Sequence, residues 1–228
     1  MPQLDALPPY LAGVALDVRG HGNSTVGHGF FSIDVFAKDV LAFIRKLAIK
    51  KPVLCGVSMG GYIALRAYQL QPDVFSGMIL SDTHSLADDN AAKQKRFDTI
   101  QSVLKNGRRP FSIGFVNNVF SQRSLRENHE AIDLIKSSIR RNTESSICAT
   151  LLALAARTDT TDSLKNVTVP VLVVRGEEDK ITAKAQMEIL TTEIPDTVYV
   201  EIAACGHLPN LEDPETFNRE MIAYLNRL

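Results

Sequence analysis

A serine flanked by glycines is the first candidate for chemistry in this sequence: Ser58, within Gly56–Gly60, which reads Gly-Val-Ser-Met-Gly. A short run rich in β-branched residues precedes it and a helix-forming run follows from Tyr62, so the order is strand, tight turn, helix. That order is typical of a nucleophile elbow, which exposes a serine at the end of its strand. The Met59 backbone N–H would then act as an oxyanion donor beside it. The pentapeptide alone also fits an ordinary glycine-rich loop.

A serine hydroxyl needs a base to take its proton, and the base needs a carboxylate to orient it. Because parallel sheets bind ligands beyond the C-terminal ends of their strands, polar residues just after a strand are the candidates. His207 follows the last apolar run on a glycine-containing loop, and Asp179 follows the run before it. We therefore expect Ser58, Asp179 and His207 to meet as nucleophile, orienting acid and general base.

Other polar residues compete for these roles. Asp82 directly follows an earlier apolar run and is the rival triad acid, with capping of the next segment as its structural alternative. Glu178, next to Asp179, is a lesser rival, and His84 lies at the same end of the predicted sheet. The remaining histidines have simpler interpretations as hydrogen-bonded loop or surface residues: His21, His28 and His129. No group of histidines and carboxylates has metal-ligand spacing, so the sequence predicts no metal and no cofactor.

The segments that must position these residues alternate between strand and helix patterns. Five apolar runs have strand length: Leu11–Val18, Val53–Val57, Val74–Ser81, Val169–Val174 and Val198–Ala203. Between several of them, apolar residues recur at helical spacing, as from Ser32 to Leu47. The alternation predicts an α/β fold with a mostly parallel sheet flanked by helices.

The middle of the chain has a different pattern. Residues 84–160 contain long helical or mixed polar stretches and no clear strand. We expect a helical cap inserted after the third strand, with residues 1–83 and 161–228 forming the core. Four apolar side chains of the cap either contact the substrate or pack the cap itself: Phe111, Phe115, Val119 and Phe120.

Composition narrows the class of protein. With 228 residues, 45% of them hydrophobic and 22% charged, the chain suits one globular α/β domain. A net charge of −1 provides no field for nucleic acid or an anionic membrane, and no apolar run has the length of a membrane span. Three cysteines without a pairing pattern indicate free thiols in a reducing compartment, so we expect a cytoplasmic protein. No oligomeric state follows from the composition.

Several motifs recur together in one known family. They are Asp17–Ser24 (Asp-Val-Arg-Gly-His-Gly-Asn-Ser), Gly56–Gly61, Val169–Asp179, Cys205–His207 and Glu212–Glu215. From about Leu4 to its C-terminus the chain resembles the α/β-hydrolase superfamily, which also has the order Ser, Asp, His. Within it, the chain resembles small cytosolic esterases and lactonases of the 3-oxoadipate enol-lactonase and arylesterase type. The resemblance implies a serine hydrolase that cleaves a small ester, lactone or thioester through an acyl-enzyme.

One departure from the family concerns the N-terminal region. Members usually begin with a hairpin and a further strand whose loop supplies a second oxyanion N–H. This sequence instead starts at what looks like the helix after that strand. In the sheet, Leu11–Val18 should therefore pair directly with Val53–Val57 or leave a gap of one strand. The chain would then be either a fragment of a longer one or a shortened variant. Two alternatives stay open. One is carbon–carbon bond hydrolysis or perhydrolysis on the same triad, and the other, which the missing strand favours, is a non-enzymatic ligand-binding or signalling protein.

Overall fold

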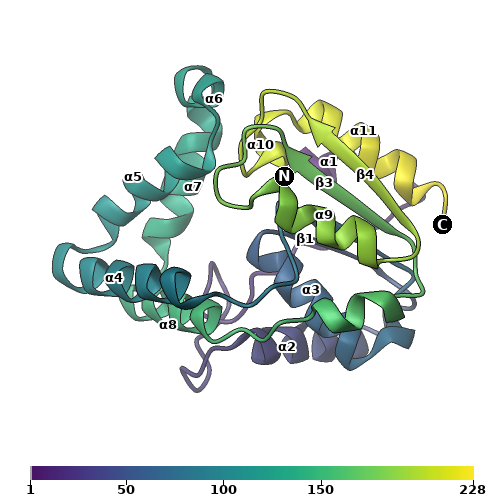
Figure 1. Cartoon of the computed structure of the whole chain (residues 1–228), viewed down its shortest axis with the longest axis horizontal. Coiled ribbons are helices and arrows are strands. Elements are labelled where there is room, and N and C mark those ends of the chain that lie inside the picture. Colours follow the sequence, from purple (N-terminus) through teal and green to yellow (C-terminus); the bar gives the residue numbers. More distant parts are fainter. Residues whose placement is uncertain (1) are drawn as a thin grey trace.

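The computed structural model describes residues 2–228, in which one parallel sheet lies between two layers of helices (Figure 1). In spatial order its strands are β1 (Val53–Val57), β2 (Gly77–Ser81), β3 (Val171–Gly176) and β4 (Thr197–Ile202). All neighbouring pairs are parallel, so the C-terminal ends of the strands lie together at one end of the sheet. The α/β class and the parallel sheet predicted from the sequence are confirmed.

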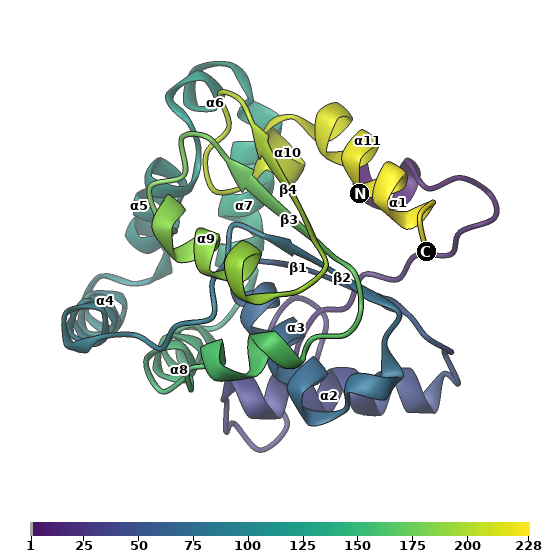
Figure 2. The same cartoon turned by 45° about the vertical axis from the view of Figure 1, so that its right-hand side comes forward.

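Helices connect the strands and cover both faces of the sheet (Figures 1 and 2). In chain order they are α1 (Pro2–Asp5), α2 (Ile33–Lys46), α3 (Met59–Leu70), α4 (Asn90–Asn106), α5 (Arg108–Val119), α6 (Gln122–Glu127), α7 (His129–Arg141), α8 (Glu144–Ala155), α9 (Lys184–Glu193), α10 (Pro209–Glu212) and α11 (Pro214–Leu225). Short 3₁₀ helices span Pro72–Val74 and Thr161–Asn166. Within residues 2–228, none of the helices combines the length and the apolar character that crossing a bilayer requires.

Alternate strand positions build a core on each face of the sheet. Met78 and Leu80 of β2 are fully buried in a cluster with α2, α3 and α9. Between them, Ile79 points to the opposite face and packs in a second cluster with Phe217 and Met221 of α11. Because β2 and β3 are buried at every position, they have the near-continuous apolar sequence expected of central parallel strands.

Two strands begin later than their apolar runs. The predicted strand from Val74 starts at Gly77, because Pro72–Val74 forms a 3₁₀ turn closed by a hydrogen bond from the Phe75 N–H to the Pro72 carbonyl. β3 starts at Val171, directly after Pro170, which has no N–H to contribute to a ladder. These shifts leave the strand order and the polar residues at the strand ends unchanged.

The prediction of a strand over Leu11–Val18 is wrong. The segment has no regular secondary structure and most of it is exposed, including Val14 at 62% and Leu16 at 40%. The direct pairing with Val53–Val57 does not occur, since β1 pairs only with β2 and forms one edge of the sheet in the described part of the chain. An apolar run becomes a strand only where a neighbouring strand can satisfy its backbone groups, and here none does.

Residues 84–160, which lie between β2 and β3 in the chain, form a helical insertion that contains α4 to α8. Its helices gather to one side of the sheet, at the left of Figure 1. They pack mainly on one another: Val116, Phe120 and Ile132 belong to one small core, and Val103 and Leu151 to another. Helices α6 and α7 are separate because the Asn128 side chain accepts a hydrogen bond from the Ala131 N–H and caps a new helix. The division into core and cap stays a prediction.

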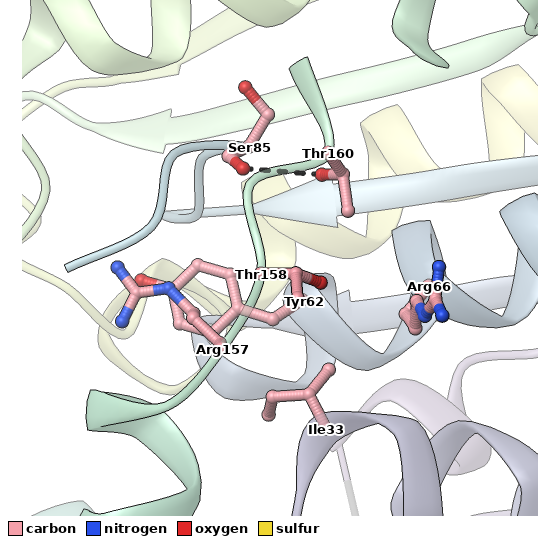
Figure 3. Close-up of a pocket in the computed structure, with 7 residues that line it drawn as sticks. All are labelled: Ile33, Tyr62, Arg66, Ser85, Arg157, Thr158 and Thr160. Carbon is pink, nitrogen blue, oxygen red and sulfur yellow. Dashed lines mark hydrogen bonds between the residues drawn. The ribbon is translucent and has the colours of Figure 1, made fainter. Parts of the chain in front are cut away.

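The two ends of the insertion are tied together where they leave the core (Figure 3). Both the N–H and the hydroxyl of Thr160 donate to the Ser85 carbonyl oxygen, the N–H over 2.9 Å. Arg157 is buried, pairs with Asp88 over 2.6 Å and lies 4.3 Å from the centre of the Tyr62 ring. These contacts connect both ends of the insertion to α3, the helix that follows Ser58.

Candidate active site

The turn between β1 and α3 carries Ser58. Its φ of 53° and ψ of −115° are strained for a residue with a side chain. The Ser58 N–H donates to the Ser81 carbonyl oxygen at the end of β2 over 2.9 Å, which holds the turn against the sheet. A Cβ on Gly56 would lie 2.3 Å from the Gly60 carbonyl carbon, whereas a Cβ on Gly60 would meet nothing within 4 Å. The close approach thus requires glycine at position 56 and not at position 60.

The loop between β4 and α10 brings His207 to this serine. His207 Nε2 lies 2.8 Å from Ser58 Oγ, and only 2% of the histidine is exposed. The His207 backbone N–H donates to the carbonyl oxygen of Val119, at the end of α5, over 2.7 Å. The imidazole is therefore positioned by the helical insertion as well as by its own loop.

Asp179 lies on the loop between β3 and α9, on the other side of the imidazole. Its carboxylate oxygens are 3.0 and 2.9 Å from His207 Nδ1. It also accepts backbone hydrogen bonds from Ile181 over 2.8 Å and Thr182 over 3.3 Å. Burial raises the pKa of the Asp179 carboxyl, but the hydrogen bond and charge of His207 and the two amides lower it more, so the net pKa falls below its usual value. This carboxylate is ionised at neutral pH.

Of the rival acids, Asp82 lies nearby but does not bond to His207. It is fully buried, with a φ of 48°, and accepts from the Gly176 N–H over 2.9 Å and from the Ser81 hydroxyl over 2.7 Å. Burial raises the pKa of the Asp82 carboxyl well above its usual value and the charge of Asp179 adds to this, while the bonds from Ser81 and Gly176 oppose it. Glu178, the lesser rival, is exposed.

The other histidines lie in structural contacts or on the surface. His84 Nε2 is 3.1 Å from the Tyr62 hydroxyl, and burial followed by the positive charge of Arg157 lowers the pKa of His84 to about 4. His21 bridges the Arg19 carbonyl and the Thr150 hydroxyl, so it ties its loop to the insertion as a loop residue would. The exposed ones are His28 and His129.

Met59, the expected oxyanion donor, is the first residue of α3. Amides in the first turn of a helix have no acceptor within the helix, so the Met59 N–H is available at the positive end of α3, next to Ser58. Within residues 2–228 no strand borders the free side of β1. A second donor from such a strand is therefore not part of the described site.

The four apolar residues proposed for substrate contact differ in exposure. Val119 and Phe120 are 1% exposed and pack inside the insertion. Phe111 packs against the core that contains Val103, and its ring centre lies 6.0 Å from that of Phe115, which is 39% exposed. Val119 and Phe120 thus belong to the insertion's own packing, and substrate contact by any of the four stays a prediction.

Sequence reasoning missed the role of Glu212. This buried carboxylate accepts from the Gly206 N–H and from the Ser121 N–H, each over 2.8 Å, and more weakly from the Leu208 N–H at 3.3 Å. It therefore clamps both neighbours of His207 and joins their loop to the insertion. The sequence did contain a signal, since Glu212 opens the motif Glu212–Glu215 five residues after His207, but that motif does not show what the carboxylate binds.

The arrangement can move one proton along a defined path. A neutral imidazole that donates from Nδ1 to Asp179 presents the Nε2 lone pair to the Ser58 hydroxyl. Asp82, Asp179 and His207 also place one polar atom each within 4.8 Å of one another, a cluster that chain spacing did not predict. Because both ring nitrogens already have hydrogen-bond partners, the geometry favours proton transfer over binding of a cation.

The chain is similar to known proteins over most of its length. The family model of the alpha/beta hydrolase fold matches residues 5–214. The 3-oxoadipate enol-lactonase 2 of Acinetobacter baylyi is 27% identical over 214 residues, which cover 94% of this chain and 78% of that protein. A thermophilic esterase from Thermogutta terrifontis, solved with malate bound, is 31% identical with a TM-score of 0.87, covering 92% of this chain and 78% of the esterase.

A second solved structure shares the architecture at lower identity. The enol-lactonase of Burkholderia xenovorans LB400 is 22% identical with a TM-score of 0.84, covering 92% of this chain and 79% of the enol-lactonase, which supports the fold alone. The family match spans both the elbow and the histidine loop, and the esterase and the Acinetobacter lactonase add related enzymes over most of the chain. The chain therefore belongs to the α/β-hydrolase fold family and is an enzyme of the α/β-hydrolase type.

Proposed function

We propose that this protein is a serine hydrolase that cleaves a carboxylic ester, lactone or thioester of a small molecule. The observation that carries the proposal is the hydrogen-bonded line from Ser58 Oγ to His207 Nε2 over 2.8 Å and from His207 Nδ1 to Asp179 over 2.9 Å. A buried imidazole held between a hydroxyl and an ionised carboxylate is the arrangement that activates a serine. The relatives named as enol-lactonase and esterase support the substrate class.

In the acylation step, Ser58 Oγ attacks the carbonyl carbon of the substrate as His207 Nε2 takes the hydroxyl proton. Asp179 holds the Nδ1–H tautomer and stabilises the imidazolium that forms. The Met59 N–H donates to the oxyanion of the tetrahedral intermediate. Collapse of the intermediate expels the alcohol, thiol or ring oxygen, which receives the proton from His207, and leaves Ser58 acylated.

In the deacylation step, water replaces the leaving group. His207 takes a proton from the water as its oxygen attacks the acyl carbon, and returns that proton to Ser58 Oγ when the second intermediate collapses. The products are a carboxylic acid and the regenerated serine. Each proton and electron pair is accounted for by these residues, substrate and water, so the proposed cycle needs no cofactor.

The helical insertion is proposed to cap the site and select the substrate. It supports His207 through Val119, and Phe115 provides an apolar side chain that is partly open to solvent. A small apolar acyl or alcohol group fits such a surface better than a charged polymer does. The three free cysteines fit a reducing compartment, which supports the proposed cytoplasmic location.

A fluorophosphonate probe tests the proposal, because it reacts only with an activated serine. We expect stoichiometric labelling of Ser58 in the folded protein, none in Ser58→Ala, and hydrolysis of short p-nitrophenyl esters that disappears with the labelling. A substrate panel with lactones, thioesters and β-diketones, run with and without peroxide, separates ester cleavage from carbon–carbon cleavage and perhydrolysis. Folded protein in which Ser58 does not react with the probe would rule out the hydrolase and favour a ligand-binding protein.

A further inference from the structure

Asp82 and Asp179 place two buried carboxyl groups beside one imidazole. Polar atoms of Asp82, Asp179 and His207 lie within 4.8 Å of one another. Asp82 is 0% exposed and Asp179 is 7% exposed, so water screens neither group well. The proposed mechanism uses Asp179 and leaves Asp82, the more buried of the two, without a role.

Two ionised carboxylates at this separation repel each other strongly when buried, so such a pair keeps one proton between them. The hydrogen-bond donors indicate which group is ionised. Asp179 accepts from the His207 ring and from two backbone amides, those of Ile181 and Thr182. A carboxylate with three N–H donors holds negative charge well, which leaves the proton on Asp82.

The surroundings of Asp82 suit a neutral acid. Its oxygens accept from one amide, that of Gly176, and from the Ser81 hydroxyl, and neither donor carries a charge. Its main chain is fixed as well: the Asp82 N–H donates to the Val174 carbonyl over 3.0 Å, and the Thr182 hydroxyl donates to the Asp82 carbonyl over 3.1 Å. The contact with Thr182 joins Asp82 to the loop that carries Asp179.

In the described part of the chain no cationic side chain bonds to the Asp82 carboxyl group, whose donors are the Gly176 N–H and the Ser81 hydroxyl. The charged and titratable groups nearby are Asp179 on the β3–α9 loop, His207 and Cys205 on the β4–α10 loop, and Arg175 on β3. The Arg175 guanidinium is directed to other groups: it pairs with Glu201 over 3.1 Å, a carboxylate that Lys184 shares, and donates to the Asp179 carbonyl over 3.3 Å. The pKa of the Cys205 thiol is raised to about 12, mainly by burial, so that group is neutral too.

We propose that Asp82 is a positioning residue that retains its proton and donates it in a hydrogen bond to the Asp179 carboxylate. The pair then carries one negative charge, and the Asp179 carboxylate is held with its oxygens toward His207. The inference rests on the triad of the proposed function. The pKa of Asp82 agrees in direction: burial raises it most, and both the charge of Asp179 and a hydrogen bond with Asp179 raise it further.

Kinetics with two variants test the positioning role. Asp82→Ala removes the hydrogen bond, and misplacement of Asp179 should lower kcat roughly 10- to 100-fold with KM nearly constant. Asp82→Asn keeps an N–H donor of the same shape without a charge, so it should recover most of that loss. The acid limb of the kcat/KM profile should keep its midpoint in Asp82→Asn, because no charge has been removed. A midpoint lowered by about one pH unit would mean that Asp82 was ionised, and would overturn the proposal.

Infrared spectroscopy tests the proton directly, whether or not the enzyme turns over. We expect the C=O stretching band of a protonated carboxyl group at neutral pH in wild-type protein and in Ser58→Ala, and its loss in Asp82→Asn. Asp89→Asn, at an exposed cap of α4, is the matched control and should keep the band. Absence of the band would overturn the proposal that Asp82 and Asp179 share a proton, even if the protein hydrolyses esters. Its presence without hydrolysis would count against the proposed function and leave the shared proton standing.

Discussion

The backbone N–H of His207 donates to the carbonyl oxygen of Val119 over 2.7 Å, so the proposed general base is hydrogen-bonded to the helical insertion. A Cβ on the adjacent Gly206 would lie 2.7 Å from the same oxygen, so the loop reaches α5 only with glycine at this position. A displacement of α5 would therefore move the imidazole. The insertion thus influences the position of a reacting group as well as access to it.

Glu212 should control this connection. In Glu212→Ala the amides of Gly206 and Ser121 lose their acceptor, and leaving buried N–H groups unsatisfied typically costs about 1–3 kcal/mol. We expect a loss of that size in urea unfolding, together with a lower kcat as the His207 loop loosens. The matched control is Glu215→Ala, since Glu215 is exposed on the next helix. Equal stability and turnover in the two variants would show that the clamp does not hold the loop.

The identity of the triad acid predicts a large asymmetry between two asparagine variants. Asp179→Asn removes the charge that fixes the His207 tautomer, so kcat for a short p-nitrophenyl ester should fall about 10⁴-fold. Asp82→Asn should lose far less, because its carboxyl group does not bond to the imidazole. Steady-state kinetics of both variants check the assignment. The reverse order of losses would assign the acid to Asp82.

The elbow predicts different costs for two neighbouring glycines. In Gly56→Ala the new Cβ would lie 2.3 Å from the Gly60 backbone, which cannot move aside as a side chain would. We therefore expect the free energy of unfolding to fall by about 1–3 kcal/mol and Ser58 to react more slowly with the fluorophosphonate probe. Gly60→Ala meets nothing within 4 Å and should be tolerated, or stabilise α3 slightly through the helix propensity of alanine. Thermal unfolding of both variants measures the difference, and similar melting temperatures would contradict this reading of the turn.

The raised pKa of Asp82 predicts how stability depends on pH. A folded-state pKa above the unfolded value of about 3.9 means stability that is complete below that value and is lost as pH rises toward the folded pKa. Above about pH 5 the unfolded state has released this proton, while the folded state keeps it until the pH approaches the folded-state pKa. Over that range the free energy of unfolding of the wild type should therefore fall by about 1.4 kcal/mol per pH unit relative to that of Asp82→Asn. Denaturant unfolding of both proteins across this range measures the slope, and parallel curves would show that Asp82 is ionised in the fold.

Much of the site could be predicted from the sequence because it depends on strand ends. Ser58, Asp179 and His207 each follow an apolar run, and parallel strands bring such positions to one end of the sheet. The buried runs of β2 and β3 were recognisable for the same reason, since both of their faces are covered.

Other features depend on contacts between distant segments. Leu11–Val18 has the composition of a strand, but a strand also needs a pairing partner, and the sequence does not say whether one is present. The role of Glu212 depends on Ser121, which lies 91 residues away in the chain. From the sequence, Asp82 and Asp179 are alternative candidates for the triad acid. Residue spacing does not show that the two carboxyl groups lie together, or which of them holds a proton.

The position of β1 at the edge of the sheet has a consequence for local motion. The strand that ends at the reactive serine is hydrogen-bonded on one side only, to β2, whereas β3 is bonded on both sides. Opening of β1 therefore breaks fewer bonds than opening of β3, and its amides should exchange with solvent deuterium sooner. The rigidity of the backbone at Ser58 then depends on the hydrogen bond from its N–H to Ser81 and on the packing of α3, so the proposed nucleophile sits at the end of an edge strand of the sheet.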